Sequence, residues 1–137
     1  MVLADSCVWS LALRRRPGAA LSARESTAIA ALEEAVRDGR IVLIGPIRQE
    51  VLSGIRDSSH FVKLQSALSA FPDFSLSTAD YEEAARFYNI CRGKGIPTGA
   101  VDILLCAAAA RNGWTVLTLD QGVQRAIEIL HGAGESL

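Results

Sequence analysis

The sequence predicts an α/β fold in which helices cover both faces of a central, mostly parallel sheet of four to five strands. Short apolar stretches typical of strands alternate with helical stretches along the whole chain. The best strand candidates are continuously apolar, as expected where a parallel sheet is buried on both faces. Because 137 residues, half of them hydrophobic, suffice for one substantial core, we expect a single domain over residues 1–137.

The predicted elements follow one another with short connections and no internal repeat. In chain order they are a strand at 1–5, helical or loop-like sequence at 6–18, a helix at 22–39, a strand at 40–45, helices at 46–55 and 58–71, a weak edge strand at 73–77, helices at 78–95 and 99–113, a strand at 114–120 and a helix at 121–132.

The helices are delimited by recognisable start and stop residues. Ser22 and Glu25 form a capping-box pattern, and Gly39 ends the helix that they begin. Pro46 suits the first turn of the next helix, whose apolar face we expect to run as far as Ile55. The strands are indicated by composition, since the stretches at 1–5, 40–45 and 114–120 are mainly apolar and the one at 40–45 is also rich in β-branched residues.

The overall charge excludes some classes of partner. With 14 basic and 15 acidic residues the formal net charge is −1, so no general field attracts nucleic acid or an anionic membrane.

Cys7, Cys91 and Cys106 lack metal-type spacing and lie among apolar residues, which favours reduced core cysteines in a reducing compartment. We find no secretory signal and no membrane-spanning apolar run, and we expect a soluble cytoplasmic protein.

Four acidic residues are placed to meet at one edge of the predicted sheet. Asp5 and Asp120 each end a predicted strand, and Glu50 and Asp102 lie near the starts of helices. The carboxyl ends of parallel strands share an edge, where ligands of open α/β sheets bind. Their mutual repulsion would be relieved by a hard divalent cation such as Mg²⁺ or Mn²⁺, which indicates metal-assisted hydrolysis of a phosphodiester.

Each acid also has an ordinary structural explanation when it is considered alone. Asp5 and Asp120 could cap helices, and Glu50 could be a solvated surface residue. Asp102 is harder to explain, because the helix that carries it is otherwise strongly apolar and a buried carboxylate needs a partner.

The ordered set LADSCVW, PIRQEVLSGI and GIPTGAVDILLCAAAARNGWTVLTLD resembles PIN-domain ribonucleases, and most closely the VapC-type toxins of type II toxin–antitoxin modules. The resemblance covers nearly the whole chain and implies a three-layer α/β/α sandwich. It implies an endoribonuclease in which Asp5, Glu50, Asp102 and Asp120 hold one or two Mg²⁺ or Mn²⁺ ions. Ser6 and Thr118, and with less support Thr98, would orient the carboxylates or water.

The resemblance also implies partners. These are an RNA substrate (a tRNA or a ribosomal RNA), a small antitoxin protein that blocks the site, and a second copy of the chain, for which the CVWSLAL stretch could supply surface. The candidate RNA-binding cations are Arg92, Lys94, Arg14, Arg15 and Arg16. A run such as 14–16 is more often a solvated face or a helix end.

The chain departs from the family pattern at Gly122, where many relatives carry a further acid, and this weakens the case for a second metal ion. A fifth edge strand is expected to be very short or missing. Two alternatives remain open at this point: a non-catalytic RNA- or protein-binding module with a PIN fold, and a housekeeping PIN nuclease without an antitoxin.

Overall fold

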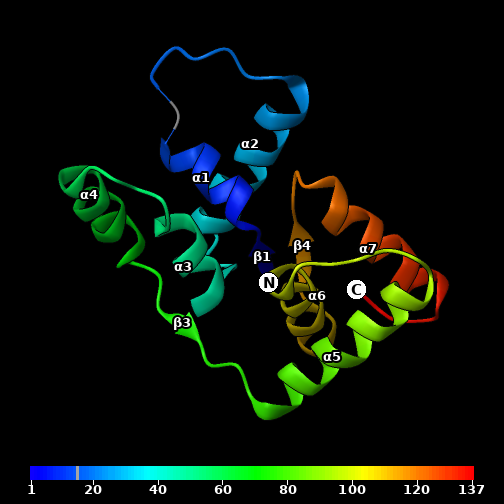
Figure 1. Cartoon of the computed structure of the whole chain (residues 1–137). Coiled ribbons are helices and arrows are strands. Elements are labelled where there is room, and N and C mark those ends of the chain that lie inside the picture. Colours follow the sequence, from blue (N-terminus) through cyan, green and yellow to red (C-terminus); the bar gives the residue numbers. More distant parts are fainter. Residues whose placement is uncertain (15) are drawn as a thin grey trace.

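The fold is built on a parallel four-stranded sheet in the order β3-β2-β1-β4 (Figure 1). The structure is a computed structural model, and it describes residues 1–14 and 16–137. The strands are β1 (Val2–Ala4), β2 (Ile41–Ile44), β3 (Asp73–Phe74) and β4 (Thr115–Leu117). The predicted α/β class, the parallel sheet and the edge position of β3 are therefore confirmed.

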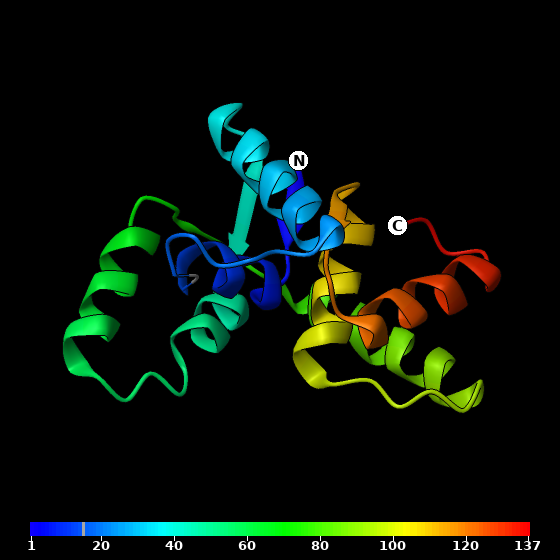
Figure 2. The same cartoon turned by 90° about the horizontal axis from the view of Figure 1, so that it is seen from above.

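Seven helices flank this sheet within the described residues. They are α1 (Ser6–Arg14), α2 (Ala23–Arg37), α3 (Gly45–Leu52), α4 (Ser58–Leu68), α5 (Thr78–Gly93), α6 (Ala100–Asn112) and α7 (Gln121–Gly132). Figures 1 and 2 show α5, α6 and α7 gathered on one side of β1, with α1, α3 and α4 on the other. None of these helices is long and apolar enough to cross a membrane.

The core lies between the two central strands and the helices packed on them. Leu3 and Ala4 of β1 and Leu43 and Ile44 of β2 are almost completely buried. The apolar helix α6 contributes seven buried residues in succession from Ile103 to Ala109, which explains why its sequence lacks a polar face. Burial of such apolar surface is the main term that stabilises the fold.

The predicted helix ends are mostly correct. Ser22 and Glu25 form the expected capping box at the start of α2. Gly113 ends α6 in the left-handed conformation with a φ of 67°, which glycine adopts without strain. The predicted extension of the third helix to Ile55 is wrong, because Ser53 is already extended and Gly54 has a φ of 80°.

Candidate functional site

Asp5 follows β1 directly, and the residue is only 3% exposed. Oδ1 accepts the backbone N–H of Ser6 at 2.7 Å, and Oδ2 accepts the hydroxyl of Thr118 at 2.8 Å. A buried carboxylate is tolerated when its oxygens are hydrogen-bonded in this way. The Asp5 carboxylate is therefore hydrogen-bonded both by Ser6, the first residue of α1, and by Thr118, which follows β4.

Ser6 links Asp5 to Glu50, the predicted site carboxylate on α3. The Ser6 hydroxyl donates to Glu50 Oε1 at 2.9 Å and lies 3.5 Å from Asp5 Oδ1. Helix α3 begins immediately after β2, so Glu50 is carried to the carboxyl edge of the sheet without an intervening loop. The structure thus places Ser6 between Asp5 and Glu50.

Thr118 links Asp5 to Asp120 at the end of β4. Its hydroxyl donates to Asp5 and accepts the backbone N–H of Asp120 at 3.0 Å. The Asp120 carboxylate also caps α7, because Oδ1 accepts the N–H of Val123 at 3.0 Å. Asp120 is therefore the N-cap of α7, and its backbone N–H also lies against the Thr118 hydroxyl that contacts Asp5.

Gly122 leaves the space that this orientation of Asp120 needs. A Cβ at position 122 would lie 2.9 Å from Asp120 Oδ1, closer than real Cβ contacts allow. A side chain there would force the Asp120 carboxylate or its neighbours to shift. The glycine at position 122, which departs from the family pattern, therefore leaves room for the Asp120 carboxylate to cap α7.

Asp102 lies in the first turn of α6 and is partly buried. Burial raises its pKa from the ordinary 3.8 to about 6, and the negative charges of Asp5, Asp120 and Glu50 add to this effect. The four acids come from four separate segments of the chain, and Asp102 lies within electrostatic reach of the other three. Such a perturbed carboxylate at the ligand-binding edge of an α/β sheet marks a candidate functional site.

The donor set suits a hard divalent cation in its chemistry. All four side chains offer carboxylate oxygens, the ligands preferred by Mg²⁺ and Mn²⁺, and a cation would relieve the repulsion that raises the pKa of Asp102. In the described part of the chain, however, no three His, Cys, Asp or Glu side chains form a group that could hold a metal ion as they stand.

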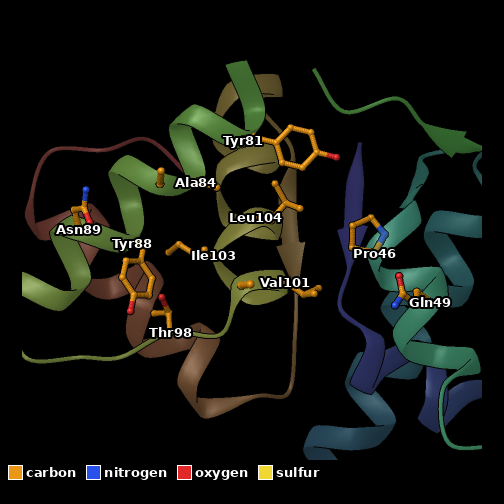
Figure 3. Close-up of a pocket in the computed structure, with 12 residues that line it drawn as sticks. Pro46, Gln49, Tyr81, Ala84, Tyr88, Asn89, Thr98, Val101, Ile103 and Leu104 are labelled. Carbon is orange, nitrogen blue, oxygen red and sulfur yellow. The ribbon is translucent and has the colours of Figure 1, made fainter. Parts of the chain in front are cut away.

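Thr98 lies apart from this hydrogen-bonded network. Its hydroxyl is buried without a hydrogen-bond partner and lines a cavity of about 800 Å³ between α3, α5 and α6 (Figure 3). Figure 3 shows Pro46 and Gln49 of α3 on one side of this cavity, with Tyr88 and Thr98 at the other end. The cavity is mainly apolar, and none of the four acids lines it. A contact of Thr98 with the carboxylates is not found.

Within the described residues, the predicted RNA-binding cations form no ion pair with the four acids. Arg92 donates to the hydroxyl of Tyr88 on its own helix, and Lys94 is the exposed C-cap of α5. Arg14 ends α1, Arg16 lines a small cavity with Pro17 and Gly18, and Arg15 lies outside the described residues.

Two residues near the acids were missed by sequence reasoning. The exposed Arg24 donates to the carbonyl of Leu119 at 3.5 Å and so reaches the loop before Asp120. Cys7, which we expected to be a plain core residue, contacts Asp5, Thr118 and Leu119. Burial raises the pKa of the Cys7 thiol, and the nearby charge of Asp5 also acts in this direction. The only sequence signal for Cys7 was its place two residues after Asp5.

Comparison with known proteins gives consistent results. The family model described as PIN domain matches residues 2–129. The VapC ribonuclease Mb1587 of Mycobacterium bovis and the ribonuclease VapC11 of Mycobacterium tuberculosis are each 29% identical over 123 residues. The alignment covers 88% of this chain and 87% of each relative.

Proposed function

The chain belongs to the PIN-domain family, and from this premise we propose that it is a metal-dependent endoribonuclease that acts as the toxin of a toxin–antitoxin pair. The observation that carries the proposal is the approach of four acids at the carboxyl edge of the sheet. Ser6 and Thr118 link Asp5 to Glu50 and to Asp120, and Asp102 lies within electrostatic reach of all three. The names of the relatives, which are VapC ribonucleases, favour RNA as the substrate. We also propose that residues 1–137 form one PIN domain.

In this proposal Asp5, Asp102 and Asp120 bind Mg²⁺ or Mn²⁺, and Glu50 assists them. The bound ion would lower the pKa of a water molecule and offset negative charge on the RNA phosphodiester. Ser6 fixes the relative position of Asp5 and Glu50 through its hydrogen bond to Glu50, at 2.9 Å. A single ion fits this chain better than two, because Asp120 caps α7 and position 122 is a glycine.

Recognition of RNA must come from local cations, since the chain as a whole carries a net charge of −1. Arg24 is a candidate, because it reaches the segment that joins β4 to Asp120. The other candidate cations are those predicted from the sequence: Arg92, Lys94, Arg14, Arg15 and Arg16. A structured RNA such as a tRNA or a ribosomal RNA loop is the proposed substrate.

The proposed partners are an antitoxin and a second copy of the chain. The α1 stretch that we expected to supply dimer surface buries Val8 and Trp9 in the core, so only its other residues are available for such contacts. Light scattering on the purified protein would report whether it is a dimer.

The three free cysteines suit the reducing cytoplasm, where a toxin of this class would act.

Induced expression in a bacterial host tests the toxin proposal. The wild-type chain should arrest growth, whereas Asp5→Asn and Asp102→Asn should not, at equal levels of folded protein. If a short reading frame lies directly beside the gene and encodes the antitoxin, its coexpression should restore growth. RNA cleavage in vitro without growth arrest would favour a housekeeping nuclease. Absence of both cleavage and Mn²⁺ binding would favour a non-catalytic binding module.

A further inference from the structure

Cys7 is the point where the first turn of α1 meets the segment between β4 and α7. Its Sγ donates to Asp5 Oδ2 at 3.5 Å, lies 3.8 Å from the Thr118 hydroxyl and accepts the backbone N–H of Leu119 at 3.5 Å. We propose that Cys7 is a positioning residue, which fixes the Asp5 carboxylate relative to the backbone that carries Asp120. This inference rests on the proposed function, because it assigns Cys7 a task in the same site.

The contacts of Cys7 complement those of its neighbours. Ser6 holds Asp5 Oδ1 and reaches toward Glu50, whereas Thr118 holds Asp5 Oδ2 and the Asp120 N–H. The Cys7 thiol also donates to Asp5 Oδ2, but the backbone N–H that it accepts is that of Leu119, one residue before Asp120. The thiol and the Thr118 hydroxyl together therefore tie the β4–α7 connection to the aspartate at the end of β1.

Sulfur is suited to this place because of its reach. Hydrogen bonds between nitrogen or oxygen atoms favour distances of about 2.7–3.2 Å, and the contacts of Cys7 at 3.5–3.8 Å are longer. A serine hydroxyl at position 7 would be withdrawn further from all three partners, because a C–O bond is shorter than a C–S bond. Serine should therefore restore only part of the function of the thiol.

Of the other two cysteines, Cys91 provides the control. Cys91 and Cys106 are fully buried, and Cys91 lies on α5 among core residues. Burial raises the pKa of Cys91, and no acid of the site contributes to that shift. Cys91→Ala removes a thiol of the same size from the core without touching the contacts that hold Asp5.

Substitution at position 7 tests the inference with three measurements on the full chain. In Cys7→Ala, exchange of the Leu119 amide hydrogen should accelerate, and Mn²⁺ affinity measured by titration calorimetry should fall about tenfold, as when a partner of a metal ligand is removed. For RNA cleavage, kcat should fall by about the same factor while KM stays near the wild-type value. Cys7→Ser should be intermediate, and Cys91→Ala should match the wild type in Mn²⁺ affinity and kcat.

The outcomes separate this inference from the proposed function. A wild-type protein that neither binds Mn²⁺ nor cleaves RNA contradicts the proposed function itself. If the wild type does both, wild-type Mn²⁺ affinity and kcat in Cys7→Ala overturn the positioning role, even when Leu119 exchange has accelerated. Equal losses in Cys7→Ala and Cys91→Ala would also overturn it, because they would reflect a general loss of stability.

Discussion

The hydroxyl of Thr118 donates to Asp5 Oδ2 at 2.8 Å across 113 positions of the sequence, and it accepts the backbone N–H of Asp120 at 3.0 Å. One side chain therefore sets the distance between two of the four acids. It can do so because β1 and β4 are neighbours in the sheet, with Ala4 paired to Leu117. The parallel register of these strands brings Asp5 and Thr118 together at their carboxyl ends.

Thr118→Val should remove both hydrogen bonds and keep the shape of the side chain. Leaving Asp5 with one partner fewer should lower the free energy of unfolding by about 1–3 kcal/mol. Urea denaturation measures this loss, and RNA cleavage should fall at the same time. Thr118→Ser keeps the hydroxyl and should stay close to the wild type in both assays. A valine variant as stable and active as the wild type would contradict the role of Thr118.

The hydrogen bond from Ser6 to Glu50 should appear as a coupling energy. In a double-mutant cycle of Ser6→Ala and Glu50→Ala on the metal-free protein, we expect a coupling of about 1 kcal/mol in the free energy of unfolding, because alanine at position 50 offers the Ser6 hydroxyl no acceptor. Ser6→Ala combined with Glu25→Gln should be additive, since Glu25 is engaged in the capping box of α2. Additivity in the first cycle would show that the contact is not formed in solution.

Asp102→Asn should change how stability depends on pH in the absence of divalent ions. The folded-state pKa of Asp102 is raised to about 6, so the folded protein holds this proton more tightly than the unfolded chain does. Its contribution to stability is complete below about pH 4 and is lost as the pH rises through 6. Thermal melts in EDTA should therefore show Asp102→Asn gaining stability relative to the wild type between pH 4 and pH 7.

Asp57 supplies the control of opposite sign for this pH experiment. The hydrogen bonds from Ser59 and His60 lower the pKa of Asp57, so its contribution is present at neutral pH and lost in acid. Asp57→Asn should therefore lose stability relative to the wild type as the pH rises. The same trend in both variants would contradict the assignment of the Asp102 shift to burial and the neighbouring acids.

Arg24→Gln should weaken RNA binding without altering the carboxylates. If Arg24 contacts one phosphate, KM should rise and the salt dependence of binding should become shallower by about one charge. Arg37, near the C-terminal end of the same helix and also exposed, is the matched control, and Arg37→Gln should change neither quantity. Equal effects of the two substitutions would point to general electrostatics instead of a contact at the site.

Much of the fold was predictable because it depends on local signals. The apolar stretch Ile41–Ile44, the capping box of Ser22 and the glycine stop at Gly113 each act within a few residues. The approach of the four acids was predictable too, because strand ends and helix starts of a parallel sheet share one edge. Asp102 was the clearest case, since an acid on so apolar a helix has little other explanation.

The fine structure of the site was not predictable, since it depends on contacts between distant segments. In the sequence Cys7 looks like an ordinary apolar residue. Its contacts with Thr118 and Leu119 exist only because the fold places the segment after β4 beside the start of α1. Thr98 precedes Asp102 by four residues, yet its hydroxyl lines the cavity of Figure 3 instead of contacting the acids. Side-chain direction at the start of a helix is set by packing that sequence spacing does not reveal.

Cleavage of a labelled RNA by metal-stripped protein tests the central claim most directly. The wild type should be inactive in EDTA and regain activity when Mn²⁺ is added in excess. Asp102→Asn, checked for a native melting transition, should stay inactive under both conditions, because it lacks the acid that is coupled to the other three. Cleavage by the wild type that persists in EDTA, or full activity of Asp102→Asn with Mn²⁺, would contradict the account.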